Sequence, residues 1–359
     1  MKFLKYMRLA LLPFGCTYGM LIRIRNLMFD TGKLPSKKYG IPVISVGNIT
    51  VGGTGKTPLT ELIIDTLKSD YKVGLISRGY KRKTKGVVVG TQNSTAQDLG
   101  DEPFQIKSKF PELLVTVAEK RVDGIDKMLQ LPDSPDLVVM DDAYQHRYVS
   151  PGLSILVMDY NRPLWKDFML PAGELREPVK GKKRANIIIV SKCPPSLSTE
   201  QQLYITQKLN LTTDQSVYFS SVAYQNSISL FCDHKQLTHK DFLEKEVLLV
   251  TGIANPEPLL KYLVSICKKV RTVHFPDHHQ FTETDIKRIN QEFEKIPNAG
   301  KMILTTEKDA VRFKEIINNT HVLAPHIWYI PIKVKMLNNQ QEEFKEKIIN
   351  YVKHNKRNS

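Results

Sequence analysis

The sequence has few cysteines, and this scarcity restricts the class of protein. Its 359 residues include four cysteines and two tryptophans. The cysteines are far apart in the sequence, and no two of them have C-x-x-C spacing: Cys16, Cys193, Cys232 and Cys267. The spacing therefore suggests neither a disulfide framework nor a zinc knuckle, and a reducing compartment fits the composition.

The sequence also lacks an apolar run near its N-terminus long enough to cross a bilayer. Residues 9–22 are uncharged and mostly apolar but number only 14, whereas a spanning helix needs about 20. A signal peptide would need a small-residue cleavage site, and none follows. We expect residues 1–35 to form an amphipathic segment at a membrane interface, with a helix packed on the protein itself as the alternative. Basic residues flank the apolar run: Lys2, Lys5, Arg8, Arg23 and Arg25.

Acidic residues are too few to balance the basic ones. The chain has 52 Lys and Arg against 37 Asp and Glu, a net charge of +15, so anionic partners are expected. Nucleic acid, acidic lipid and phosphorylated substrates would all fit this charge. No basic stripe interleaved with aromatic residues is present, so we expect no nucleic-acid partner.

A glycine-rich segment, VGNITVGGTGKTP, lies between an apolar run at residues 41–46 and an amphipathic pattern that begins near Leu59. This order predicts a strand, a phosphate-binding loop and a helix. Lys56 would reach the β- and γ-phosphates of a nucleotide, and the Thr57 hydroxyl would hold Mg²⁺. A glycine-rich turn without a ligand is the alternative. The expected nucleotide-binding residues are Thr50, Gly52, Gly53, Thr54, Gly55, Lys56 and Thr57.

Apolar runs alternate with helical patterns along the chain, which predicts parallel sheets covered on both faces. A polar stretch at residues 194–216 suggests a domain boundary. We therefore expect an α/β protein with a P-loop NTPase-like parallel-sheet domain at residues 36–215. A second, smaller α/β domain would occupy residues 216–359 and would end in a charged helix from Gln340.

An acidic pair follows another apolar run in LVVMDDAYQHR. The pair, Asp141 and Asp142, would lie at the carboxyl end of a strand beside the glycine loop, where one carboxylate can hold Mg²⁺. Gln145 and His146 would lie at the mouth of the site. A capped turn is the alternative interpretation.

Further charged motifs leave two interpretations open. In LGDEPFQIK, Asp101 caps a helix or acts as a base or metal ligand together with Glu102. Arg78 and Tyr80 belong to SRGYKRK, which contacts phosphate or headgroups or is a solvated face. Surface charge is likewise the alternative to a site role for three residues: Arg121, Arg176 and Glu177.

The segment HFPDHHQFT has three histidines and an aspartate within a few residues. It would bind a metal, provide a carboxylate–imidazole pair for proton transfer, or form a surface loop. His278 is the central residue of this segment.

Eight motifs in order resemble those of the tetraacyldisaccharide 4′-kinase family of the lipid A pathway. They extend from Gly47 to Arg312 and are GNITVGGTGKTP, SRGY, GDEP, DDAYQHR, LPAGELREP, TGIANP, FPDHH and TTEKDAVR. The resemblance implies transfer of the γ-phosphate of ATP, with Mg²⁺, to the 4′-hydroxyl of a tetraacyl glucosamine disaccharide 1-phosphate. It also implies peripheral attachment to the anionic cytoplasmic face of a bacterial inner membrane through an N-terminal membrane-associated helix, with a site between two domains.

The resemblance also implies roles for individual residues. Asp101 matches the base that acts on the sugar hydroxyl, and His278 matches the histidine paired with it. Lys56 and Thr57 match the phosphate and Mg²⁺ positions, and Asp141 and Asp142 match the acidic pair. Other site positions with less defined roles are Arg78, Tyr80, Glu102, Arg121, Gln145, His146, Arg176 and Glu177.

The chain departs from the family pattern at two motifs. Ala143 and Tyr144 replace a glycine and a phenylalanine, so this turn must not need a positive φ at residue 143. Glu174 replaces a proline. Neither change removes a proposed catalytic group.

A membrane-associated P-loop switch that does not phosphorylate lipid is the main alternative function, and a nucleic-acid-binding ATPase is a weaker one. The segment IIIVSKCP resembles the guanine-binding N-K-x-D motif only weakly, because Ser191 and Pro194 replace the asparagine and the aspartate. This argues against guanine selection.

Overall fold

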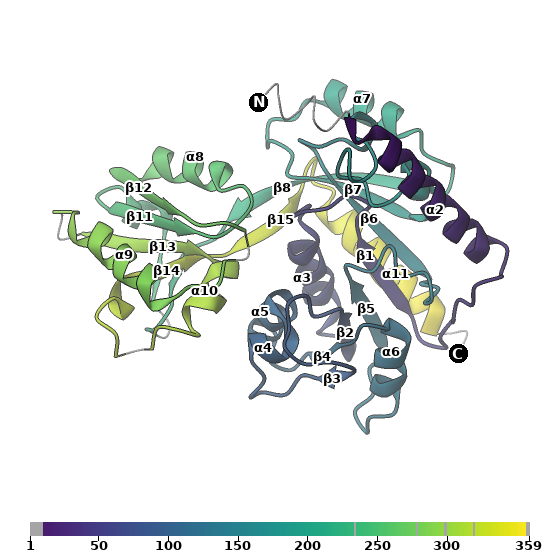
Figure 1. The fold of residues 1–359 in the computed structure, drawn as a ribbon, viewed down its shortest axis with the longest axis horizontal. Coiled ribbons are helices and arrows are strands. Elements are labelled where there is room, and N and C mark those ends of the chain that lie inside the picture. Colours follow the sequence, from purple (N-terminus) through teal and green to yellow (C-terminus); the bar gives the residue numbers. More distant parts are fainter. Residues whose placement is uncertain (1–9, 233–234, 278, 298–299, 319, 357–359) are drawn as a thin grey trace. The chain divides into compact units, whose positions relative to one another are not determined.

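The computed structural model describes residues 10–232, 235–277, 279–297, 300–318 and 320–356. The chain divides into two compact units. The first contains the residues up to Val222 and those from Val334 onward, and the second contains Ala223–Lys333 (Figure 1). Each unit has its own sheet and its own apolar cores, as an α/β protein with two domains requires.

The first unit is built on a nine-stranded sheet with the order β15-β8-β7-β6-β1-β5-β2-β4-β3. The strands from β8 to β4 in this order pair in parallel, and β3 pairs antiparallel with β4. The expected parallel sheet is therefore confirmed. The strands are β1 (Val43–Gly47), β2 (Val73–Ser77), β3 (Val88–Val89), β4 (Leu114–Val117), β5 (Leu137–Asp141), β6 (Leu153–Asp159), β7 (Ile187–Ser191), β8 (Ser216–Tyr224) and β15 (Ile332–Met336).

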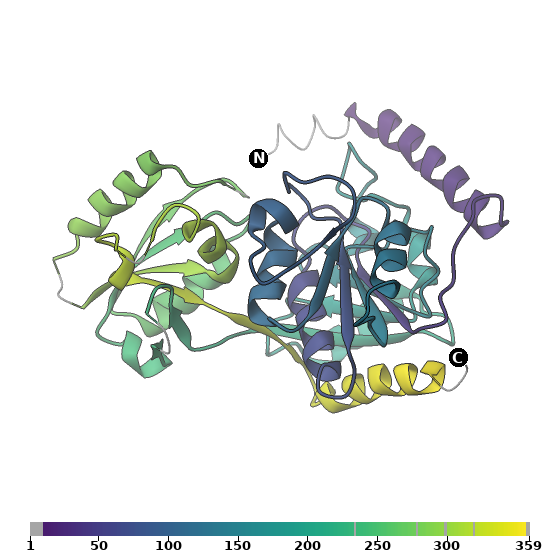
Figure 2. The same cartoon turned by 90° about the horizontal axis from the view of Figure 1, so that it is seen from below.

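Helices cover both faces of this sheet (Figure 2). Ile44 and Val46 of β1 pack with α3 (Lys56–Leu67), α5 (Asp101–Lys109) and α11 (Gln341–Lys356) in one core. The opposite face packs against α6 (Arg121–Leu129) and α7 (Thr199–Leu209). The remaining elements of this unit are α4 (Ala96–Leu99) and the 3₁₀ turns η1 (Leu164–Lys166) and η2 (Val179–Arg184).

The C-terminal helix belongs to the first unit, which differs from the expected domain division at residues 215 and 216. Phe344, Ile348 and Val352 of α11 are fully buried in the same core as α3. Strand β8, expected in the second domain, pairs with β7 instead. The chain thus leaves the first unit after Val222 and returns at Val334.

The second unit has a six-stranded sheet with the order β10-β9-β14-β13-β11-β12. Its four neighbouring strands from β14 to β12 are parallel, whereas β9 and β10 are antiparallel additions. Its elements are β9 (Ser227–Ser229), β10 (Gln236–Leu237), η3 (His239–Phe242), β11 (Glu246–Thr251), α8 (Glu257–Ile266), β12 (Lys269–His274), α9 (Glu283–Glu294), β13 (Lys301–Thr306), α10 (Glu307–Phe313), η4 (Ala324–His326) and β14 (Ile327–Ile330).

The N-terminal segment contains helix α2 (Leu12–Asp30), and its two faces differ. Gly15 and Gly19 lie against the loop around Met169, and Phe29 packs edge-on against Tyr148. The other face exposes large apolar side chains. No helix in the described part of the chain is long and apolar enough to span a membrane. The exposed side chains are Leu11, Phe14, Met20, Leu21, Ile24, Leu27 and Met28.

Candidate active site

The glycine loop connects the end of β1 to the start of α3, as the sequence predicts. Gly52 and Gly55 have φ angles of 84° and 86°, a left-handed conformation that residues with a Cβ rarely adopt. Gly55 is the N-cap residue of α3, so the helix begins at Lys56. Within the described part of the chain, the N–H groups of Gly52, Gly53, Thr54 and Gly55 make no backbone hydrogen bond. Together with the N-terminus of α3, such groups favour a bound anion.

Polar contacts inside the loop fix its shape. Asn48 Nδ2 donates to Thr54 Oγ1 at 2.9 Å, and both residues are fully buried. Asn48 was not among the expected site residues. A buried asparagine directly after an apolar strand is the signal that could have identified it.

The acidic pair lies next to Lys56, at the carboxyl end of β5. Lys56 Nζ is 3.5 Å from Asp142 Oδ1, and Thr60 Oγ1 donates to Asp141 Oδ1 at 3.1 Å. Among the described residues, Asp141 Oδ2 is buried and has no hydrogen-bond donor, whereas Asp142 Oδ1 faces Lys56 Nζ. A buried carboxylate oxygen of Asp141 is thus available beside the phosphate loop.

The two carboxyl groups differ in acidity. Burial raises the pKa of Asp141 to about 7, and the nearby charges of Glu102 and Asp142 add to the rise. Burial also opposes ionisation of Asp142, but Lys56 and Arg176 outweigh it and lower the pKa of Asp142. Asp142 is therefore the ionised partner of Lys56 at neutral pH.

The turn after β5 accommodates the alanine that departs from the family pattern. Asp142 has a φ of 46°, and Ala143 is not among the described residues with a positive φ. The left-handed conformation falls on the aspartate, and the requirement stated for Ala143 is met. Asp142 is a non-glycine residue held in a sparsely populated conformation, which is common at functional sites.

Arg121 and His146 form a partly buried contact beside the acidic pair. The Arg121 backbone N–H donates to His146 Nε2 at 3.0 Å, and the Arg121 guanidinium donates to the Ala118 carbonyl at 3.1 Å. Burial lowers the pKa of Arg121 to about 10 and that of His146 to about 4. Arg121 is only 3% exposed, so it is not a solvated surface charge.

The LPAGELREP segment lies along the glycine loop. Val51 N–H donates to the Glu174 carbonyl and Arg176 N–H to the Ile49 carbonyl, both at 2.8 Å. The Arg176 guanidinium donates to the Thr50 carbonyl at 3.1 Å and lies 3.5 Å from Asp142 Oδ2. The structure therefore brings Arg176 to the site.

Gln145 and Glu177 make contacts on the side of α2. Gln145 Nε2 donates to the Asn48 carbonyl at 2.7 Å, so this residue also lies beside the loop. Glu177 is 1% exposed and pairs with Arg184 at 2.8 Å, while Asn26 of α2 donates to its carboxylate at 3.1 Å. Glu177 anchors the N-terminal helix rather than the phosphate loop.

Asp101 and Glu102 begin α5, but Asp101 is not its cap. The N-cap residue is Gly100, with a φ of 87°, so the capping interpretation of Asp101 does not describe this structure. Asp101 is 7% exposed. Glu102 is close enough to Asp141 for its charge to raise the pKa of that residue.

The two expected residues of the SRGYKRK motif are at the surface. Arg78 is exposed, and its charge helps to lower the pKa of both Arg121 and His146. Tyr80 is 63% exposed. Arg82 of the same motif is structural, because it pairs with Glu119 at 2.6 Å.

The histidine segment of the second unit is only partly described, because His278 lies outside the described residues. His279 Nε2 lies 2.9 Å from Asp285 Oδ2, and His274 Nδ1 lies 3.2 Å from Thr251 Oγ1. Across the described residues, no group of three or more His, Cys, Asp or Glu side chains could hold a metal ion.

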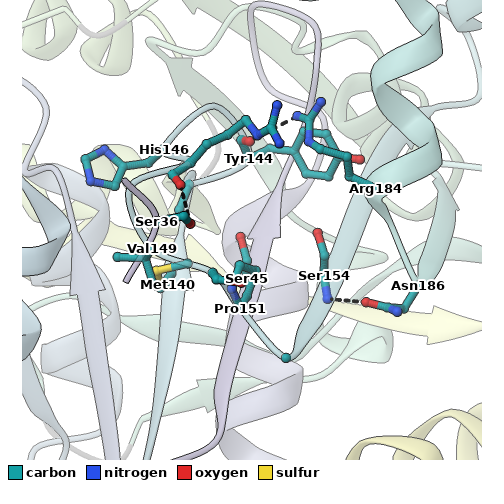
Figure 3. A pocket seen from close by; sticks show the side chains of 14 residues that line it. Ser36, Ser45, Met140, Tyr144, His146, Val149, Pro151, Ser154, Arg184 and Asn186 are labelled. Atoms are coloured by element: carbon teal, nitrogen blue, oxygen red, sulfur yellow. Dashed lines mark hydrogen bonds between the residues drawn. The ribbon is translucent and has the colours of Figure 1, made fainter. Parts of the chain in front are cut away.

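A separate cavity of about 300 Å³ lies over the sheet face that α6 and α7 cover. The Ser45 and Ser154 hydroxyls, on neighbouring strands β1 and β6, point into it from the same side (Figure 3). Two arginines also line it, but Arg147 pairs with Asp30 and Arg184 with Glu177. Because both guanidinium groups are already paired with carboxylates, the cavity is a poor second anion site.

Comparisons with known proteins agree with this geometry. The family model described as Tetraacyldisaccharide-1-P 4′-kinase matches residues 7–353. The chain belongs to this family. The tetraacyldisaccharide 4′-kinase of Bacteroides thetaiotaomicron is 44% identical over 358 residues, which cover 97% of this chain and 94% of that protein. That of Flavobacterium johnsoniae is 41% identical over 349 residues, with 97% and 98% covered.

A solved structure of the family has the same fold. The crystal structure of the apo form of LpxK from Aquifex aeolicus, in complex with ATP, superposes with a TM-score of 0.75 at 30% identity. The match covers 96% of this chain and 99% of that one. The predicted kinase family and α/β fold are thereby confirmed.

Proposed function

We propose that this member of the 4′-kinase family transfers the γ-phosphate of ATP to the 4′-hydroxyl of a tetraacyl glucosamine disaccharide 1-phosphate. The observation that carries the proposal is the juxtaposition of the glycine loop, Lys56 and the acidic pair. The loop N–H groups and Lys56 would bind the terminal phosphates. Phosphoryl transfer depends mainly on such positioning and on neutralising charge.

The residues present fit a bound Mg²⁺ ion. Asp141 Oδ2 is a buried oxygen without a hydrogen-bond donor among the described residues, and Asp142 offers a second carboxylate that faces Lys56. Oxygen ligands are those that Mg²⁺ prefers. Thr57, in the first turn of α3, would add its hydroxyl. Bound there, Mg²⁺ would neutralise negative charge on the phosphates.

We assign Asp101 the role of base for the acceptor hydroxyl. A sugar hydroxyl is a weak acid, so removing its proton as the phosphate bond forms lowers the barrier. Asp101 is nearly buried at the start of α5, next to Glu102, whose charge acts on Asp141. His278 would orient this base, as the family resemblance implies.

Several cations would hold the anionic parts of the two substrates. The Arg176 guanidinium already contacts the loop and Asp142, and Arg121 is buried beside them. Arg78 is exposed and acts electrostatically on the same place. Three further residues are proposed to line the acceptor site, namely Tyr80, Gln145 and His146, whereas Glu177 would support the site by holding α2.

The exposed face of α2 supports attachment to a membrane surface, which the family resemblance implies is the cytoplasmic face of the bacterial inner membrane. Phe14, Met20 and Leu21 are each more than 60% exposed, and Arg23 on the same helix is also exposed. Apolar side chains would enter the acyl boundary, and basic groups would meet anionic headgroups. The lipid acceptor lies in the same surface.

The test of the function is transfer of label from γ-labelled ATP. With the disaccharide lipid present, the phosphate should appear in lipid, and Lys56→Met should abolish the transfer. A regulatory switch would instead release free phosphate at the same rate with and without the lipid. That result would contradict the proposal.

A further inference from the structure

Three carbonyl groups of the glycine loop are held from outside by side chains that the proposed mechanism does not use. Lys192 Nζ donates to the Gly53 carbonyl, and Ser191 Oγ donates to the Thr54 carbonyl at 2.6 Å. Arg162 Nη1 donates to the Val51 carbonyl at 3.2 Å. We call Arg162, Ser191 and Lys192 the carbonyl clamp.

The donors of the clamp are themselves fixed in place. Lys192 Nζ pairs at 2.9 Å with Asp159, which is 5% exposed at the end of β6. Lys192 has a φ of 58°, a conformation that is unfavourable for a residue other than glycine. A strained backbone conformation persists where the surrounding contacts hold it. In this conformation the side chain of Lys192 reaches the loop.

Glu174, the residue that replaces a family proline, belongs to the same network. Its Oε2 is 2.7 Å from Arg162 Nη1, and its own carbonyl accepts the Val51 N–H at 2.8 Å. A proline could not supply this carboxylate. The departure therefore adds a support for Arg162.

The geometry of the peptide unit gives the clamp a consequence. In a planar trans peptide, the C=O and the following N–H point in opposite directions. Holding the carbonyls of Val51, Gly53 and Thr54 outward therefore turns the N–H groups of the residues that follow them inward. Within the described chain, these three N–H groups make no backbone hydrogen bond; they belong to Gly52, Thr54 and Gly55.

We propose that Arg162, Ser191 and Lys192 are positioning residues that aim the loop N–H groups at the nucleotide phosphates. The inference rests on the proposed nucleotide site and adds to it the residues that preorganise it. N–H groups that already have the right direction need no rearrangement when the phosphates bind. Small errors in their position weaken their hydrogen bonds to the phosphates strongly.

The test compares the affinities of ATP and adenosine in the full-length protein. Lys192→Met should weaken ATP about tenfold and adenosine less than about twofold, since only the phosphates meet the loop. Ser191→Ala should weaken ATP by a smaller factor, and Lys192→Arg should restore part of the affinity. Calorimetry measures ATP binding, saturation-transfer NMR measures adenosine, and thermal unfolding verifies that each variant is folded.

The matched control is Lys180→Met, which removes the same charge at an exposed position of η2 and should bind ATP as the native chain does. Unchanged ATP affinity in both Lys192→Met and Ser191→Ala would overturn the proposal. Equal losses of affinity for ATP and for adenosine would also overturn it, because they would mean that Lys192 acts on the adenosine part of the nucleotide and not on its phosphates. These measurements need no lipid. A wrong proposal about the clamp would therefore show in the ATP affinities, whereas a wrong proposal about the acceptor would show only as the absence of labelled phosphate in lipid.

Discussion

Asp141 and Asp142 are adjacent and chemically identical, yet their surroundings shift their pKa values in opposite directions. Asp141 is buried beside two other carboxylates, whereas Asp142 faces Lys56 and Arg176. A metal ion would favour the ionised form of Asp141 as well. Both carboxyl groups would thus be ionised when the nucleotide and the metal ion are bound together.

Replacing Asp101 tests the proposed base directly. Asp101→Asn keeps the size of the side chain but cannot accept the proton. We expect kcat to fall about 100-fold or more while the KM for ATP changes less than about threefold. Steady-state kinetics with both substrates varied measures the two parameters.

The control for this prediction is Asp133→Asn, whose carboxylate is 91% exposed. It removes the same charge far from any proposed chemistry and should leave kcat unchanged. Near-native turnover in Asp101→Asn would remove Asp101 from the role of base.

His146 should remain neutral under mildly acidic conditions. Burial and the nearby Arg121 lower its pKa to about 4, whereas an unfolded histidine titrates near about 6.5. Between these values the unfolded chain binds the extra proton, so the stability that His146 contributes is present above pH 6.5 and is lost as the pH falls toward 4.

NMR titration of the folded protein measures this prediction. The His146 ring resonances should not shift between pH 8 and pH 5.5, and the same ring should titrate normally in denaturant. A midpoint near 6.5 in the folded protein would show that the ring is solvated and would contradict its partly buried contact with Arg121.

At the scale of elements, α2 serves two surfaces. Tyr18, Arg25 and Asn26 form hydrogen bonds with other parts of the first unit, and the opposite face carries the exposed apolar side chains. The packed-helix and interfacial interpretations of this segment are therefore compatible, because each describes one face.

Charges placed on the exposed face should reduce membrane binding without affecting the nucleotide site. The double variant Phe14→Glu and Leu21→Glu loses two side chains that are 65% and 61% exposed. Its binding to vesicles of anionic lipid should weaken about tenfold or more, and its ATP affinity should not change. Co-sedimentation with vesicles gives the first quantity.

Leu243→Glu is the matched control, since Leu243 is also 61% exposed but lies in the second unit. It should bind vesicles as the native chain does. If the double variant partitions like Leu243→Glu, the apolar face of α2 does not bind the membrane.

Helix α11 should be essential for the stability of the first unit. Phe344 is fully buried and packs edge-on against Tyr218 with ring centres 5.5 Å apart. Phe344→Ala should lower the free energy of unfolding by about 3 to 5 kcal/mol, because it leaves a cavity beside α3. Urea denaturation followed by circular dichroism measures the change.

The exposed neighbour Glu346 provides the comparison, and Glu346→Ala should change stability by less than about 0.5 kcal/mol. Equal stability of the Phe344 and Glu346 variants would mean that α11 does not complete this core.

For the molecule as a whole, the sequence predicted what is local and missed what depends on distant pairing. The glycine loop and the acidic pair follow buried strands, so their positions at one sheet edge could be predicted. The placement of β8 and α11 in the first unit could not, because their patterns fit either sheet. The clamp was missed since Ser191 and Lys192 act on backbone carbonyls, which leave no mark in a side-chain motif.

The most direct test of the account is a crystal structure with a non-hydrolysable ATP analogue and Mg²⁺, under conditions where turnover is measured. The β- and γ-phosphates should lie against the N–H groups of residues 52–57 and Lys56, with the metal between them and the acidic pair. An analogue bound elsewhere, with this loop empty, would contradict the central claim.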